Sequence, residues 1–136
     1  MKGSHILATV CLVGLAGAAL VAGGQTTQSF SGRDEFHVFC ASCHGDSAKG
    51  DGPVASSLRK KPVDLTQLAL KNNGAFPTET VFKTIDGRTP VSGHGGPDMP
   101  VWGDVFAQSR ESAGAEGVKA RVGSLVSYLE SIQEKR

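Results

Sequence analysis

Residues 40–44 read Cys-Ala-Ser-Cys-His, two cysteines three positions apart with a histidine directly after them. On a helical turn, residues i and i+3 share one face, so Cys40 and Cys43 would present both sulfurs to the same side, with His44 close behind. Two thiols and an imidazole in this pattern can attach one haem covalently and ligate its iron. The motif therefore predicts a haem c site, with Cys40 and Cys43 as attachment points and His44 as an iron ligand.

Other sites also use a Cys-x-x-Cys pair, namely a disulfide, half of a zinc site or a thioredoxin-type redox pair. Zinc needs four ligands and usually a second pair at similar spacing, and no such pair follows in this sequence. A dithiol oxidoreductase places the motif after a strand in a βαβ pattern, and no strand-like run adjoins residues 40–44. Haem attachment is therefore the preferred interpretation.

Residues 1–24 have the layout of a secretory signal peptide. Lys2 precedes an uncharged apolar stretch over residues 6–22, and small residues follow it, so cleavage is predicted after Gly24. The apolar stretch is about 17 residues long, at the lower limit for a membrane span, and an uncleaved anchor is the alternative. Cys11 lies within this stretch and is expected to leave with the leader. This segment predicts export to the periplasm.

Length and charge limit what remains to one small, nearly neutral domain. Removing 24 of the 136 residues leaves 112, and without Lys2 there are 13 basic and 13 acidic residues. A balanced charge without a basic stripe interleaved with aromatic residues argues against a nucleic-acid partner. Residues 25–31 are small and polar and predict a flexible linker, so residues 32–136 form the predicted domain.

Helices are predicted along most of this domain from apolar spacing and from residues that begin or end helices. The first covers residues 32–43 and carries the haem motif at its C-terminal end, where Gly45 stops it. Shorter helical segments are predicted at residues 54–58, at residues 65–71, and from a Thr78 cap to a stop at Gly87. Residues 88–103 contain three prolines and four glycines and predict an extended loop.

The most regular pattern lies near the end of the chain. Apolar residues recur at steps of four, three, four and three, at Val118, Val122, Leu125, Leu129 and Ile132. This spacing predicts a helix over residues 116–134 with one buried face. Because two-residue alternation is nowhere sustained, the sequence predicts an all-α fold.

The second axial position of the iron needs its own ligand, and Met99 is the leading candidate. It is the only methionine besides the initiator, and it lies in the proline-rich loop. A lone methionine more often fills a core, but a thioether ligand would favour ferrous iron and raise the reduction potential. His94, flanked by glycines in the same loop, is the rival ligand, although a hydrogen-bonding loop role is preferred for it.

Three other features bear on the predicted haem site. Trp102, the only tryptophan, is expected to pack against the porphyrin or to close the loop that carries Met99. The basic run at residues 59–61 predicts a solvated surface turn in preference to a docking patch. His37 is interpreted as a surface or packing residue, because it lies on the same predicted helix as His44.

With these motifs in place, the chain resembles the class I monohaem c-type cytochromes over residues 32–132. The similarity rests on the haem motif and on four weaker motifs, G-D-G-P at 50–53, P-V-D-L-T at 62–66, M-P-V-W-G at 99–103 and L-V-S-Y-L at 125–129. The resemblance implies a small helical fold wrapped around one covalently bound haem. It also implies thioether bonds at Cys40 and Cys43, His44 as proximal ligand and Met99 as distal ligand.

The resemblance implies two further contacts. In that family the first and last helices cross at a close contact, and the matching residues are Gly32 and Phe36 with Leu125 and Tyr128. A proline carbonyl commonly accepts the N–H of the proximal imidazole, and Pro53 is the matching candidate for this part of the haem pocket. The glycine- and proline-rich insert around residue 94 departs from the family pattern.

The sequence thus predicts a periplasmic one-electron carrier and not an enzyme, because two side-chain ligands would occupy both faces of the haem. Its expected partners are a redox protein that donates the electron and another that accepts it, with the carrier itself a monomer. Membrane contact is expected only through an uncleaved leader or a membrane-bound partner. The alternatives are a haem c subunit permanently bound in a dehydrogenase or terminal oxidase complex, and a peroxide- or gas-binding protein in which Met99 dissociates.

Overall fold

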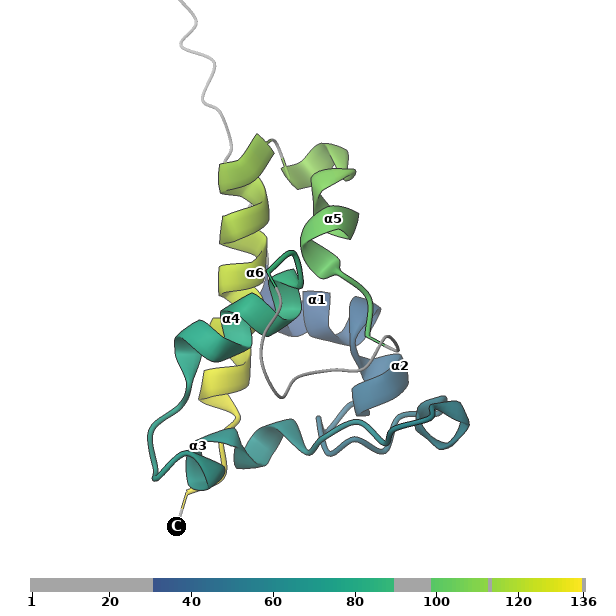
Figure 1. Cartoon of the computed structure of the whole chain (residues 1–136), viewed down its shortest axis with the longest axis vertical. Coiled ribbons are helices and arrows are strands. Elements are labelled where there is room, and N and C mark those ends of the chain that lie inside the picture. The colour runs from purple at the N-terminus through teal and green to yellow at the C-terminus, as the bar shows by residue number, and fades with distance from the viewer. Residues whose placement is uncertain (1–30, 90–98, 113, 136) are drawn as a thin grey trace, which may run out of the picture.

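A computed structural model describes residues 31–89, 99–112 and 114–135, and they form helices joined by turns (Figure 1). These ranges contain no β-strand, so the prediction of an all-α fold is confirmed. The predicted leader, most of the predicted linker and His94 lie outside the described residues. None of the described helices is both long enough and apolar enough to cross a membrane.

Helix α6 (Gly114–Ser131) is the longest element, and most of the fold packs around it. Helices α1 (Gly32–Phe39), α4 (Thr78–Asp86) and α5 (Trp102–Ala107) and the short 3₁₀ helix η3 (Arg110–Ser112) all contact it (Figure 1). The predicted apolar stripe faces these neighbours, and four of its members are at most 3% exposed, namely Val118, Val122, Leu125 and Leu129. The fold therefore buries this stripe as the sequence predicts.

Helix α1 crosses α6 with the two backbones in contact. A Cβ atom on Gly32 would lie 1.9 Å from the Ser124 carbonyl oxygen, so only glycine fits at this crossing. Phe36 is fully buried beside it, with its ring centroid 5.4 Å from that of Tyr128. The contacts predicted for Gly32 and Phe36 with the last helix are thus present.

Helix α1 begins at Gly32, the first residue of the predicted domain, and its N-cap lies one residue earlier. Ser31, which the sequence analysis assigned to the linker, is the N-cap residue, and its hydroxyl accepts a hydrogen bond from the Asp34 N–H at 3.3 Å. A serine in this position satisfies one of the backbone N–H groups that a helix start leaves without an intrahelical partner. Ser31 therefore caps the first helix of the predicted domain.

The helix predicted over residues 32–43 is interrupted at Cys40, so this prediction is corrected. Helix α1 ends at Phe39, and the rest of the motif forms the short helix α2 (Ala41–His44). Cys40 has a φ of −115°, outside the regular helical range, although its carbonyl still accepts the His44 N–H at 2.9 Å. Gly45 ends α2 with a φ of 79°, as predicted.

Between α2 and α4 the chain forms three short elements, η1 (Ala55–Ser57), η2 (Leu65–Gln67) and α3 (Leu68–Lys71). They match the predicted segments at 54–58 and 65–71, except that the second begins as a 3₁₀ turn. The Asp64 carboxylate caps it by accepting the Thr66 N–H at 2.9 Å. These elements cover the lower side of the molecule in Figure 1.

The end of α6 is shorter than predicted because residues 132–135 bind η2 and α3 instead of continuing the helix. The Gln133 amide donates to the Leu65 carbonyl at 2.7 Å and accepts the Ala69 N–H at 2.8 Å. The Glu134 N–H donates to the Thr66 carbonyl at 2.9 Å. These hydrogen bonds hold the C-terminal segment against a part of the chain that lies more than 60 positions earlier in the sequence.

Helix α4 ends at Gly87 with a left-handed φ of 69°, as predicted, and α5 begins at Trp102, inside the segment predicted as a loop to residue 103. Gly103 explains the earlier helix start, because it packs closely on the end of α4. A Cβ atom there would lie 2.4 Å from the Asp86 carboxylate, which also accepts a hydrogen bond from Arg88 Nε at 2.9 Å. The helix start is therefore set by a tertiary contact.

Candidate functional site

The structure brings the predicted haem residues to one cavity of about 250 Å³. Cys40, Cys43, His44, Met99 and Trp102 all line it, although they lie up to 62 positions apart in the sequence. Much of the remaining wall is apolar and comes from Phe36, Phe39, Leu58, Leu65, Leu68, Val81, Ile85, Leu125 and Leu129. The cavity thus has the predicted thiols and ligands on an apolar background.

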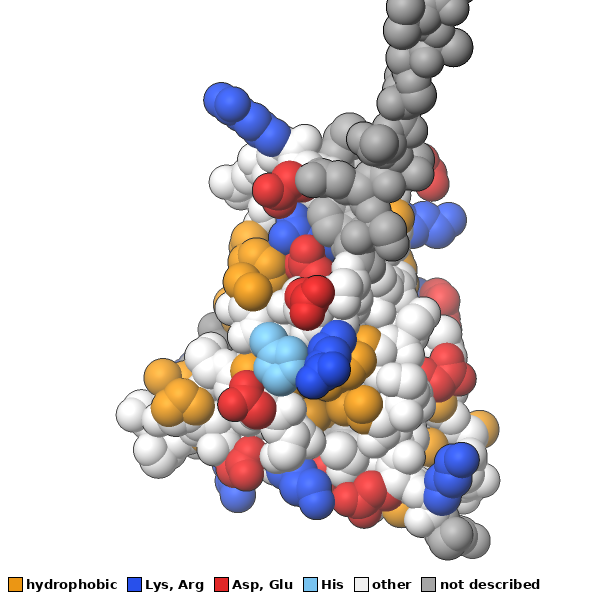
Figure 2. Space-filling model, turned by 180° about the vertical axis from the view of Figure 1, so that it is seen from behind, with side chains coloured by type: hydrophobic (Ala, Val, Ile, Leu, Met, Phe, Trp, Pro, Cys, Tyr) orange, Lys and Arg blue, Asp and Glu red, His pale blue; other side chains and the backbone are white. Residues whose placement is uncertain are grey.

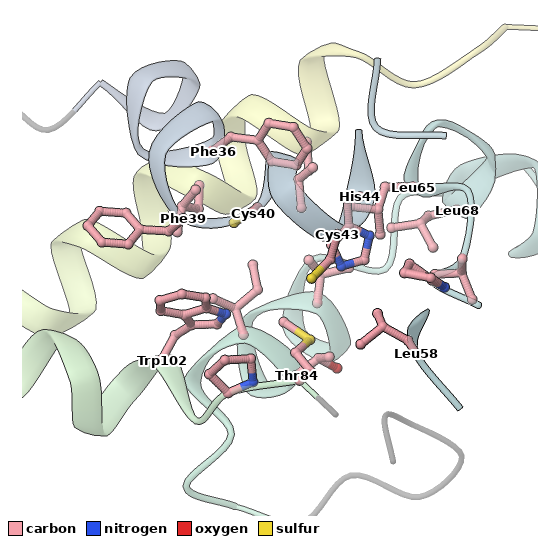
Figure 3. Close-up of a pocket in the computed structure, with 18 of the residues that line it drawn as sticks. Phe36, Phe39, Cys40, Cys43, His44, Leu58, Leu65, Leu68, Thr84 and Trp102 are labelled. Carbon is pink, nitrogen blue, oxygen red and sulfur yellow. The ribbon is translucent and has the colours of Figure 1, made fainter. Parts of the chain in front are cut away.

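Figure 3 shows the relative placement of these side chains. Cys43 and His44, both from α2, point toward the space bounded by Trp102 and Thr84. Trp102 is the first residue of α5 and Thr84 belongs to α4, so the side of the cavity that faces α2 comes from other parts of the chain. A flat group bound between α2 and these residues would contact both sides.

Burial of the His44 side chain favours the form of the imidazole that a metal ligand needs. Burial lowers the pKa of His44, and a hydrogen bond with the Val63 backbone opposes this effect. The ring is therefore favoured in its neutral form, which has a nitrogen lone pair available for a metal ion. Its Nδ1 atom is buried and has no hydrogen-bond partner among the described residues.

The hydrogen bond predicted between His44 and Pro53 is not formed, so this prediction is corrected. Pro53 is exposed and does not line the cavity. The turn around it is held against α2 by its neighbours, because the Gly52 N–H donates to the Cys43 carbonyl at 3.2 Å and the Val54 N–H to the Ser42 carbonyl at 3.1 Å. This pairing places the turn beside the motif without giving Nδ1 an acceptor.

Cys40, between α1 and α2, and Cys43, within α2, are half-buried free thiols. The Cys43 N–H donates to the Cys40 carbonyl at 3.1 Å, which keeps both residues on one turn. Burial raises the pKa of Cys40 to about 12, with further contributions from the negative charge of Glu35 and from Cys43. Cys40 is therefore a neutral thiol at physiological pH, a form with low intrinsic reactivity.

Met99 is half-buried, lines the cavity and lies three residues before the start of α5. It shares the cavity wall with Thr84 and Ile85 of α4. The structure places Met99 in the cavity that contains His44, as an axial ligand would require. Its choice over His94 stays a prediction, since His94 lies outside the described residues.

Trp102 forms part of an aromatic cluster at one side of the cavity. Its ring stacks on Phe106 with centroids 5.7 Å apart and meets the edge of Phe39 at 5.5 Å. Both neighbours also pack against each other, at 5.6 Å. Such aromatic contacts hold the indole in a defined orientation, so Trp102 is a fixed part of the cavity wall.

Three lysines at the cavity were missed by the sequence analysis. Lys60, Lys61 and Lys71 line it, whereas the run at 59–61 was interpreted only as a solvated turn. Their side chains are exposed, and no acidic residue is found among the described residues that line the cavity. Positive charge at an apolar cavity favours a ligand with an apolar body and anionic substituents.

Arg121 is a second functional candidate that the sequence analysis did not identify. It is buried in α6, and its guanidinium lies 4.3 Å from the Phe106 ring centroid and 5.1 Å from that of Phe39. Its spacing from Val118 and Leu125, three and four residues, places it on the buried face of α6. That spacing is the signal by which it could have been found.

His37 is exposed, as predicted, and does not line the cavity. Its Nδ1 atom lies 3.1 Å from the Asp46 carboxylate. This surface contact, on the side of α1 away from the cavity lining, gives His37 no route to a bound haem. The interpretation of His37 as a surface residue is confirmed.

Comparison with known protein families, curated proteins and solved structures finds no match to this chain. Function is therefore argued from the cavity itself, from the motif that delivers two thiols and an imidazole to it, and from the methionine at its wall.

Proposed function

We propose that this protein is a periplasmic one-electron carrier with the fold of a class I c-type cytochrome. Cys40 and Cys43 would hold one haem c through thioether bonds, with His44 and Met99 as its axial ligands. The observation that supports this most strongly is the placement of Met99, 55 positions after His44, in the cavity that the attachment motif lines. The apolar walls and the lysines at the cavity also suit a haem with its two carboxylates.

The bound haem would supply reversible one-electron chemistry between ferric and ferrous iron. The His44 imidazole is favoured in its neutral form by burial, and the Met99 thioether would favour the ferrous state. Apolar side chains around both would exclude water and disfavour the more highly charged ferric form. One electron would come from a reduced redox protein and pass to an oxidised one, so that each cycle restores the starting state.

The surface suits brief contacts with such partner proteins. Figure 2 shows acidic and basic side chains interspersed over the back of the molecule, with small groups of hydrophobic side chains between them. Five exposed valines contribute to the apolar surface of the described residues, namely Val38, Val54, Val63, Val101 and Val105. A monomer that meets its donor and its acceptor in turn is consistent with this mixed surface.

The experiment that tests the ligand set is an absorption spectrum of the ferric protein in the far-red region, where iron–thioether ligation gives a weak band. Met99→Ala should abolish this band, because alanine has no thioether to ligate the iron. The matched control is His94→Ala, which should retain it. A band that persists in Met99→Ala would contradict the proposed ligand set.

A further inference from the structure

A buried ion pair joins α1 to α6 behind the aromatic side of the cavity. Arg121 Nε lies 2.8 Å from Glu35 Oε2, and the two side chains are only 5% and 11% exposed. Arg121 Nη1 also donates to the hydroxyls of Ser109 and Ser112, at 3.2 and 3.4 Å. The carboxylate of the exposed Glu111 lies farther off, 3.7 Å from Nη1, so the buried charges at this position are those of Arg121 and Glu35.

The pair lies close to the proposed haem attachment point. The Arg121 guanidinium lies over the ring of Phe39, which itself lines the cavity, so one aromatic side chain stands between this charge and the cavity. Glu35 precedes Cys40 by five residues in the chain, and its negative charge is among the causes that raise the pKa of Cys40. The electric field of the pair therefore reaches the cavity wall.

Stability alone does not explain two charges in this position. A buried ion pair costs so much desolvation that apolar residues of similar size often serve at least as well. Other charges near the cavity, on Lys60, Lys61 and Lys71, are exposed, and water and salt screen them. Water and salt therefore screen the charges of Glu35 and Arg121 far less than those of these lysines.

We propose that Glu35 and Arg121 set the reduction potential of the haem through their opposing charges, with neither side chain touching the iron. This inference rests on the proposed function. Ferric haem has one more positive charge than ferrous haem, so the negative charge of Glu35 stabilises the ferric form and lowers the potential. The positive charge of Arg121 does the opposite, and in the native protein the two effects largely cancel.

The test is an optical redox titration of the purified haem-loaded protein and of three variants, Glu35→Gln, Arg121→Gln and the double variant. At a fixed ambient potential, the ferrous-to-ferric ratio should rise about three- to tenfold in Glu35→Gln, the scale expected for a partly buried charge at an effective dielectric constant of about 20. It should fall by a similar factor in Arg121→Gln. With both charges removed, the double variant should return to within about twofold of the native ratio.

The matched control is Glu79→Gln, the same substitution in the exposed pair with Lys83, whose atoms are 3.0 Å apart. This control should leave the ratio unchanged, because water screens an exposed pair.

Shifts of the same sign in both single variants would overturn the inference, since loosened packing around the haem acts in one direction only. If Arg121→Gln does not fold, the Glu35→Gln and double variants decide the question, and an unchanged ratio in Glu35→Gln overturns it. A native protein without any haem spectrum would instead contradict the proposed function. The two failures are therefore distinguishable.

Discussion

Replacing Gly32 by valine is expected to lower the free energy of unfolding by about 3 kcal/mol or more, because a side chain at this position cannot fit between α1 and α6. Even its first carbon would lie 1.9 Å from the Ser124 carbonyl oxygen, which is part of the α6 backbone and cannot rotate away. Moving α1 outward would also open the packing around Phe36. Urea denaturation followed by circular dichroism measures the loss.

Gly123→Ala is the matched control for this prediction. Gly123 lies in α6 next to Ser124, but an added Cβ atom there meets no other atom within 4 Å. Alanine should therefore raise the free energy of unfolding by about 0.5–1 kcal/mol through its better helix propensity. A loss below about 1 kcal/mol in Gly32→Val would mean that the two helices do not cross as closely as described.

Arg121→Ala should lower the free energy of unfolding by about 3–5 kcal/mol, the range measured when one partner of a buried ion pair is removed. Glu35 would keep a carboxylate that is almost fully buried and has lost its 2.8 Å contact. The packing of the guanidinium on Phe106 would be lost as well. Chemical denaturation of the purified variant measures the change.

Two further variants distinguish the loss of a buried charge from a general sensitivity of the fold to substitution. Lys83→Ala removes one partner of the exposed pair with Glu79 and should cost only about 0.3–0.5 kcal/mol. The double variant Glu35→Leu with Arg121→Met, which fills the same space with apolar groups, should recover stability to within about 1 kcal/mol of the native protein. An Arg121→Ala loss no larger than that of Lys83→Ala would contradict the burial of this pair.

Features set by neighbouring residues were predictable from the sequence. The apolar stripe of α6 follows from helical spacing alone, and its first four members are buried. Asp64, Gly45 and Gly87 begin or end elements as predicted, because capping and left-handed turns depend on a few adjacent residues. The all-α fold class follows from the same local signals.

Features set by distant contacts were not predictable. Helix α5 begins early because Gly103 packs on Asp86, and α6 ends early because Gln133 binds residues near 65. The interruption of the helix at Cys40 was likewise not predictable, because no glycine or proline, the residues that usually break a helix, lies at that position. In each case the deciding partner or geometry lies outside the local sequence pattern.

The candidate site shows the same division. Cys40, Cys43 and His44 are adjacent in sequence, so one motif located them, and Met99 was found because the chain has so few methionines. Lys71 was missed since only the fold brings it to the cavity. Arg121 was overlooked because its charge suggested an exposed position, although its spacing on α6 placed it among buried residues.

The most direct measurement of the central claim is the mass of the peptide that contains residues 40–44, released from the exported protein after expression with haem-attachment machinery. The account predicts a single peptide with the mass of one added haem and with both cysteines resistant to alkylation. Two free cysteines that react with an alkylating reagent, on a peptide without added mass, would contradict it.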